Sequence, residues 1–205
     1  MMTYLLPKNW QYPDAILPVS DTICSPSQDT TTNQTAGSPR LKVAKGSTVA
    51  LQYNENGHIT KPQNNAPGKE TPGKVYVYGT TQSQPSDSFL KIHKQWTEDG
   101  SGGDGRGRLL YSGPFDDGHC YQYSSHDPGE FSSIEEARES QWPPPGSADP
   151  AQGMNLWCRA DVTLPNDINT DLYTLYWVWD FPSYADDRLR YQPQYYTTCI
   201  DLDIE

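Results

Sequence analysis

The sequence predicts an all-β fold, an antiparallel β-sandwich of the immunoglobulin-like or fibronectin III-like type with long loops. Its 205 residues include 18 Pro, 16 Gly and 14 Tyr, which favours short strands joined by ordered loops over helices. About seven stretches of β-forming residues are separated by turn residues, as in such a sandwich. A chain of this length can bury a sizeable core, so we expect residues 1–205 to form a single domain.

The expected elements follow from alternation and β-propensity. Segments predicted to be strands are, in chain order, 40–44, 47–53, 74–79, 119–123, 154–164, 172–181 and 194–204. Ser132–Arg138 is predicted to be a short helix because it carries a capping-box pattern. Residues 88–96 are predicted to form a helical turn or an irregular strand. The remaining segments read as irregular or extended connections, namely 1–39, 54–74, 99–108 and 142–151.

The last two predicted strands carry the most information. In 172–181, apolar residues occur on both faces, which predicts a central strand. Alternation in 194–204 places one set of side chains toward the core, namely Gln194, Tyr196, Thr198, Ile200, Leu202 and Ile204. Gln194 and Tyr196 therefore lie in line with the core face, near the point where the sheet meets solvent. Polar groups there need hydrogen-bond partners or a function.

The four cysteines predict two disulfides. They include no C-x-x-C pair, which disfavours a zinc ribbon or a redox dithiol. Three connectivities are possible, and we favour Cys24–Cys199 with Cys120–Cys158, which would tie the N-terminal segment to the last strand. Disulfides indicate an oxidising compartment, and the sequon Asn33-Gln34-Thr35 agrees with a secreted glycoprotein.

The N-terminal residues point the other way. Met1–Pro7 has neither the basic region nor the apolar region of a signal peptide. Two interpretations follow: a cytosolic protein, or a sequence that starts inside a larger precursor.

The formal net charge of −11 makes nucleic acid and anionic membrane surfaces poor partners. A neutral polysaccharide is compatible with this charge. No apolar run approaches the roughly 20 residues that span a bilayer. We therefore expect a soluble protein, and we expect it to be a monomer.

Few residues stand out as candidate site residues. His58 follows a predicted core strand and is either a surface histidine or a metal ligand, since imidazole suits copper, zinc, iron or nickel. Tyr196 with Gln194 is either ordinary strand packing or part of a site. The other histidines read as surface groups, namely His93, His119 and His126. The paired acids read as solvated surface because nothing fixes a glycosidase spacing, namely Asp116-Asp117 and Glu135-Glu136.

Several segments, in their order along the chain, resemble the fungal lytic polysaccharide monooxygenases, and in particular a fungal secreted domain of unknown function that is similar to them. The segments are Asn56-Gly57-His58, Gly73–Tyr78, Ser88–Ile92, Leu172–Trp179 and Gln194-x-Tyr196-x-x-Cys199. The resemblance implies copper held by a histidine brace on an immunoglobulin-like sandwich. It implies that His58 is the second brace histidine, that Tyr196 is the axial residue and that Gln194 is an outer hydrogen-bonding group. The implied activity is oxidative cleavage of a polysaccharide or cell-wall glycan with O₂ or H₂O₂.

This sequence differs from the family pattern at its first residue, because position 1 is methionine rather than histidine. We expect an N-terminally truncated form, as from an incomplete gene model, or a short form that cannot assemble the brace. Either would bind copper weakly and lack monooxygenase activity. The alternatives are a non-catalytic secreted protein that binds glycan or copper on the same scaffold, and a structural cell-surface protein without metal.

Overall fold

The computed structural model describes residues 4–6, 21–32, 34, 37–61, 71–127, 129, 131–146, 152–184 and 191–205. Only the backbone is described for 4–6, 182–184 and 191–193. The fold is mostly β, with sheets packed as a sandwich, so the predicted class is confirmed. The glycosylation sequon at Asn33 and the connection at 147–151 fall outside the described residues.

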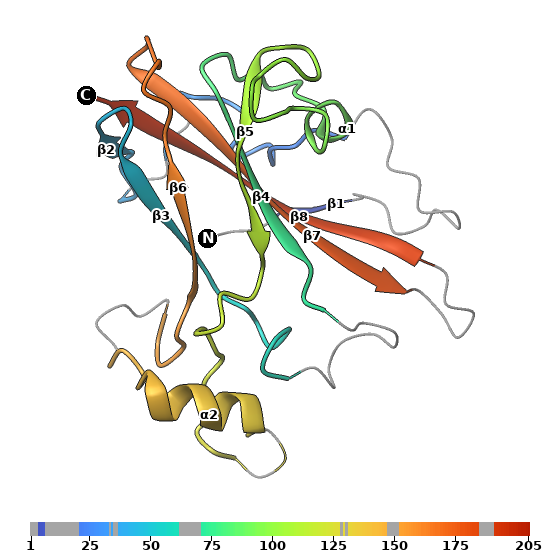
Figure 1. The fold of residues 1–205 in the computed structure, drawn as a ribbon, viewed down its shortest axis with the longest axis vertical. Coiled ribbons are helices and arrows are strands. Elements are labelled where there is room, and N and C mark those ends of the chain that lie inside the picture. Colours follow the sequence, from blue (N-terminus) through green and yellow to red (C-terminus); the bar gives the residue numbers. More distant parts are fainter. Residues whose placement is uncertain are drawn as a thin grey trace.

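Ten elements are described, and Figure 1 labels them. They are β1 (Tyr4–Leu6), β2 (Leu41–Val43), β3 (Thr48–Tyr53), β4 (Lys74–Thr80), α1 (Phe89–Ile92), β5 (Gly107–Pro114), α2 (Ser133–Gln141), β6 (Cys158–Thr163), β7 (Leu172–Tyr184) and β8 (Tyr191–Ile204). The larger sheet has the order β1-β8-β7-β4-β5, with β2 also paired to β8, and the smaller sheet pairs β3 with β6. The β2–β8 pair is parallel, which differs from the fully antiparallel arrangement that we expected.

Two predicted segments differ from the structure. Residues 107–114 form β5, which pairs with β4 along its whole length, although the glycines before it suggested a loop. Residues 119–123 contain only an isolated bridge between Tyr121 and Leu156, so that predicted strand is wrong. In both segments pairing with a distant strand, rather than local propensity, decides the outcome.

The larger sheet is covered on both faces, and β7 lies at its centre as predicted. One face of β7 contributes Tyr173, Leu175, Trp177, Trp179 and Phe181 to the core between the two sheets. The other face contributes Tyr176 and Val178 to a second core, where α1 packs. Figure 1 shows β3 and β6 lying over one part of the larger sheet, with α1 near one end of it.

The alternation predicted for β8 is confirmed. Tyr196, Ile200 and Leu202 contribute to the core between the sheets, whereas Tyr195 and Cys199 face the second core. The sequence therefore gives the correct face for Tyr196, because one side of β8 carries its aliphatic residues.

Both predicted disulfides are present. Cys24 is bonded to Cys199 and links the N-terminal segment to β8, with 5.6 Å between the Cα atoms. Cys120 is bonded to Cys158 at the start of β6, with 4.6 Å between the Cα atoms.

Helix α2 confirms the predicted helix and extends it to Gln141. Its N-terminal residue is capped as the sequence indicated, because the Ser132 hydroxyl oxygen accepts the Glu135 N–H at 3.1 Å. In Figure 1, α2 lies beyond the ends of β3 and β6. In the part of the chain that the structure describes, neither helix has the length and apolar character that a membrane span requires.

Candidate functional site

The loop that carries His58 follows β3 and is held by one buried carboxylate. Glu55 has no solvent exposure, and its oxygens accept the N–H of Ile59 at 2.6 Å, the hydroxyl of Thr60 and the N–H of Gln122 at 2.9 Å. Because Gln122 lies two residues after Cys120, Glu55 ties the His58 loop to the disulfide-bonded segment. Sequence reasoning missed Glu55, although an acid beside Asn-Gly in a turn was a signal that could have pointed to it.

The turn itself needs unusual backbone angles. Asn56 has φ +50° and Gly57 has φ +78°, both in the left-handed region that glycine and asparagine tolerate best. The His58 N–H then donates to the Glu55 carbonyl at 3.0 Å, and the Lys61 N–H donates to the Gly57 carbonyl at 3.0 Å. The Asn-Gly pair therefore fixes the direction in which the imidazole leaves the backbone.

The half-buried imidazole of His58 lies against two aromatic side chains of β7. Its ring centroid is 5.1 Å from that of Trp179 and 4.7 Å from that of Phe181, with the rings near perpendicular in both pairs. Trp179 is fixed in turn, because its ring stacks on Phe115 at 3.9 Å and its indole N–H donates to the Pro72 carbonyl at 2.6 Å. His58 is therefore packed on a rigid aromatic support.

Tyr196 contacts the same support from β8. Its ring stacks on Trp179 with centroids 4.8 Å apart and an angle of 25° between the rings, and it lies 6.4 Å from Phe181. Strand pairing explains this position, because Tyr196 is directly opposite Trp179 in the β7–β8 register. The structure thus brings His58 and Tyr196, which are far apart in sequence, to one cluster formed with Trp179 and Phe181.

Gln194 is placed close by through the same register. It is half-buried, lies directly opposite Phe181 and shares the parity of Tyr196 along β8. All three predicted site residues therefore lie at one end of the β7–β8 pair, two on β8 and one in the loop after β3.

The chemistry available at this cluster is limited and specific. The Tyr196 phenol is protonated at neutral pH, because the ordinary tyrosine pKa is near 10 and burial raises it further, so it can donate a hydrogen bond or act as a weak neutral ligand. His58 supplies an imidazole, the group that binds copper, zinc, iron or nickel. A metal here would have His58 as its nitrogen ligand from the described residues, and Tyr196 contacts the same Trp179–Phe181 support.

The remaining histidines divide into two kinds. The side chains of His119 and His126 are 55% and 51% exposed, as predicted. His93 is only 6% exposed, so its interpretation as a surface group is wrong. Polar neighbours in the sequence misled the prediction, because His93 ends helix α1 and turns into the second core beneath Phe89 and Tyr195.

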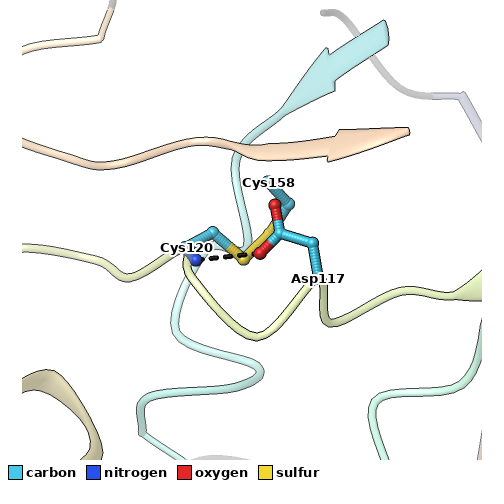
Figure 2. Close-up of side chains that lie close together, drawn as sticks. All are labelled: Asp117, Cys120 and Cys158. Carbon is cyan, nitrogen blue, oxygen red and sulfur yellow. Dashed lines mark hydrogen bonds between the residues drawn. A yellow bond between two sulfur atoms is a disulfide. The ribbon is translucent and has the colours of Figure 1, made fainter. Parts of the chain in front are cut away.

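One other cluster has metal-ligand side chains, and it is structural. Among the described residues, Asp117, Cys120 and Cys158 form the only group of three possible ligands within one metal-sized region. Figure 2 shows that the two sulfur atoms are bonded to each other and that the Cys120 N–H points to the Asp117 carboxylate. A disulfide has no thiolate to offer a metal. Asp117 instead accepts backbone N–H groups of His119, Cys120 and Arg159.

The paired acids are therefore not simply solvated surface, as the sequence suggested. Besides Asp117, Asp116 pairs with Arg138 at 2.8 Å. Glu135 has no solvent exposure and accepts the Ser124 N–H at 2.7 Å. Glu136 is exposed as predicted. Three of these four carboxylates fix backbone or charge pairs within the fold.

Comparison with curated proteins of known function finds no match. A family model, described as "Domain of unknown function (DUF7492)", matches residues 1–205. The match spans every described element, including the His58 loop and the β7–β8 pair that carries Tyr196. The chain therefore belongs to the DUF7492 family.

Proposed function

We propose that this fold carries copper-dependent oxidative cleavage of a polysaccharide, in the manner of the lytic polysaccharide monooxygenases, in a form in which further nitrogen ligands complete the metal site. One observation carries the proposal: His58 and Tyr196, the two residues that the resemblance assigns to copper, pack on the same Trp179–Phe181 pair. His58 and Tyr196 are nearly 140 positions apart in the sequence. Two residues chosen at random at that separation would not be expected to contact the same pair of side chains.

Each residue has a defined task in this proposal. His58 would hold the metal through its imidazole, with its loop fixed by Glu55. Tyr196, whose phenol is protonated at neutral pH because its ordinary pKa is near 10 and burial raises it further, would act as a neutral neighbour of the metal. Gln194, the previous residue on the same face of β8, would offer its amide as a hydrogen-bonding group near the metal. Copper, when bound, supplies one-electron activation of O₂ or H₂O₂, which no side chain here can perform.

Among the described residues, no group of three metal-ligand side chains includes His58. We therefore propose that the chain as printed holds copper through His58 only weakly.

Copper titration followed by electron paramagnetic resonance tests the role of His58. We expect the chain to bind Cu(II) with a dissociation constant above the micromolar range, with a nitrogen coupling that disappears in His58→Ala. The matched control is His119→Ala, an exposed histidine on another loop, which should leave the signal unchanged. A sub-micromolar constant, or a signal that survives in His58→Ala, would contradict this assignment.

A second candidate function is a non-catalytic secreted protein that binds glycan or copper. The observation in its favour is that, among the described residues, no group of three metal-ligand side chains includes His58. Reductant-dependent production of peroxide or of oxidised oligosaccharides by a copper-loaded form beginning with histidine would exclude this candidate. Its absence at full copper occupancy would favour it.

We also propose secretion, in line with the two disulfides, since such bonds persist in oxidising compartments. Their reduction potentials give the test. Potentials below about −300 mV are typical of structural disulfides in secreted proteins, and measured values well above this would contradict the proposal.

A further inference from the structure

A groove of about 880 Å³ opens beside the ends of β4, β5 and β7. Its residues include Lys74, Tyr76, Lys94, Asp116 and Asp180. Asp180 and Tyr76 alternate with residues that face the core between the sheets, so the groove opens on the face of the larger sheet opposite to Trp179. Its lining also includes Pro72, whose carbonyl accepts the Trp179 indole N–H, so the groove adjoins the support of the His58 cluster, although neither His58 nor Tyr196 lines it.

Asp180 is the most unusual group in this groove, because it is 8% exposed yet carries a charge. Its Oδ2 atom accepts the Lys94 ammonium at 2.6 Å and lies 3.5 Å from the Nε2 atom of buried His93. Burial would raise the pKa of Asp180, but the nearby His93 imidazole and the hydrogen-bonded Lys94 ammonium lower it below its ordinary value. The carboxylate is thus held ionised at the groove wall.

The tautomer of His93 follows from its neighbours. The Tyr78 hydroxyl accepts the Lys94 backbone N–H at 2.9 Å, so its own proton can be donated to the His93 Nδ1 atom, which lies at 3.1 Å. Nδ1 is then an acceptor and Nε2 carries the proton. Nε2 lies 3.5 Å from the Asp180 Oδ2 atom but makes no hydrogen bond among the described residues, so the Lys94 ammonium is the group that holds this carboxylate in place.

Lys94 is held in place at a conformational cost. Its φ of +59° lies in the left-handed region, which lysine adopts rarely and which costs on the order of a hydrogen bond. This conformation lets the backbone N–H reach Tyr78 while the ammonium reaches Asp180, 5.6 Å from the centre of the Tyr76 ring. Strain of this kind is concentrated at functional sites.

The charges of the groove indicate the class of ligand. Asp180 is compensated by Lys94 and Asp116 by Arg138, at 2.6 and 2.8 Å. Lys74, exposed at the start of β4, adds one positive charge to the lining. Both paired carboxylates keep lone pairs that can accept hydroxyl protons, and the Lys74 ammonium can donate to a hydroxyl oxygen. The Tyr76 ring adds a half-buried apolar surface beside them. Hydroxyl donors around a flat apolar face are the features of a sugar ring.

We propose that this groove is a binding site for a short neutral saccharide, held by Asp180 and Lys94 through hydrogen bonds and by Tyr76 through ring contact. The site does not depend on copper or on His58. It would hold a glycan against Asp180 and Tyr76, on the face of the larger sheet opposite to Trp179.

Calorimetric titration with neutral hexasaccharides tests the proposal, with cellohexaose, laminarihexaose and chitohexaose as probes. Binding of at least one neutral probe is expected. Asp180→Asn should weaken that binding about tenfold or more, because a hydrogen bond to a charged acceptor is lost. Tyr76→Ala should weaken it about three- to tenfold. Lys94→Met should also weaken it while leaving the fold intact, since this side chain is 52% exposed.

Matched control variants distinguish a loss of binding at the groove from a general effect of the substitution on folding or surface charge. Lys42→Met removes an exposed lysine paired with Glu205, and Asp161→Asn removes an exposed acid paired with Arg159; both should bind as the unaltered chain does. His58→Ala should likewise bind unchanged, which separates this site from the proposed copper site.

Three outcomes would overturn the proposal. They are no binding of any neutral probe, tighter binding of hexagalacturonate or of a chitosan hexamer than of the neutral probes, and neutral binding that is unaffected by Lys94→Met and Asp180→Asn in folded protein.

Discussion

Glu55 and Asp117 show how single carboxylates organise the loops of this protein. Each carboxylate accepts the N–H groups of three backbone positions. In a sheet, the carbonyl groups of a neighbouring strand would accept such N–H groups. Long loops leave many backbone groups to satisfy, and a short acid that reaches several of them can replace a strand partner. The His58 loop owes its position to this effect more than to apolar packing.

Replacing Glu55 should therefore destabilise the whole protein. Glu55→Ala leaves three buried donors without an acceptor, at a cost of about 1–3 kcal/mol for each unsatisfied group, so we expect a loss of at least about 3 kcal/mol in urea unfolding. Glu98→Ala, at an exposed acid, is the control and should change stability by less than about 0.5 kcal/mol. Equal unfolding midpoints for the two variants would contradict the role given to Glu55.

His93 should make stability depend on pH. Burial lowers its pKa, against the opposing effect of Asp180, whereas the unfolded chain binds a proton near pH 6.5. Because the unfolded state then binds more protons, the free energy of unfolding should fall as the pH drops below about 6.5. His93→Gln should make this fall shallower between pH 7 and pH 5.

His126 gives the opposite sign and so serves as the control. Its hydrogen bond to Glu139 raises its pKa, so its contribution is present below about pH 6.5 and is lost as the pH rises through the folded value. His126→Gln should therefore steepen the loss of stability on acidification. Identical pH profiles for the two variants would show that neither histidine is linked to folding as described.

Strand β7 is the central strand of the larger sheet, and one of its side chains lies so close to β4 that a larger residue cannot replace Gly79. Gly79 of β4 lies opposite Leu175, and a Cβ there would be 2.4 Å from the Tyr173 hydroxyl and 2.7 Å from a methyl of Leu110. Tyr173 is buried and packed in the core between the sheets. This glycine is therefore required by close approach rather than by a turn.

Gly79→Ala should cost about 1–3 kcal/mol through overpacking, as measured by thermal or urea unfolding. Gln52→Ala in β3 alters an exposed strand position and provides the comparison, with an expected change below about 0.5 kcal/mol. If Gly79→Ala were as stable as Gln52→Ala, the close approach of Tyr173 would not limit this strand.

Across the whole molecule, the two disulfides compensate for a loop-rich chain. Cys24–Cys199 closes a separation of 175 residues and Cys120–Cys158 one of 38. The Cys24–Cys199 bond joins the N-terminal segment to β8. The Cys120–Cys158 bond joins the segment that Glu55 ties to the His58 loop to the start of β6. Each restrains a part of the unfolded chain that the sheets alone would leave free.

Removing each bond by a double Cys→Ser substitution should rank the two. Chain entropy predicts losses of about 5 kcal/mol for Cys24–Cys199 and about 4 kcal/mol for Cys120–Cys158, to be measured by urea unfolding under oxidising conditions. Unfolding of either variant at room temperature would agree with a large loss. A larger loss for Cys120–Cys158 would show that packing strain, rather than loop length, controls the ranking.

Local patterns in the sequence were sufficient for several features. Alternation along β8 gave the faces of Tyr196 and Cys199, and apolar residues on both faces of β7 gave its central position. The capping residue Ser132 gave the start of α2. Each of these depends on neighbours a few positions apart, whose spacing matches the period of a strand or a helix.

Other features were set only by contacts between distant segments. Strand β5 exists because β4 accepts it as a partner, and His93 is buried because α1 is packed on the second core. The shared contact of His58 and Tyr196 with Trp179 depends on the acceptor role of Glu55 and on Trp179 lying opposite Tyr196.

The sequence by itself determined the fold class, the strand faces and the number of disulfides of this protein, since these follow from the period of side chains along a strand and the number of cysteines. Only the tertiary structure decided the partners of β5, the burial of His93 and the shared aromatic support of His58 and Tyr196. The physical reason is that hydrogen bonds and ring contacts between segments far apart in sequence leave no local pattern to read.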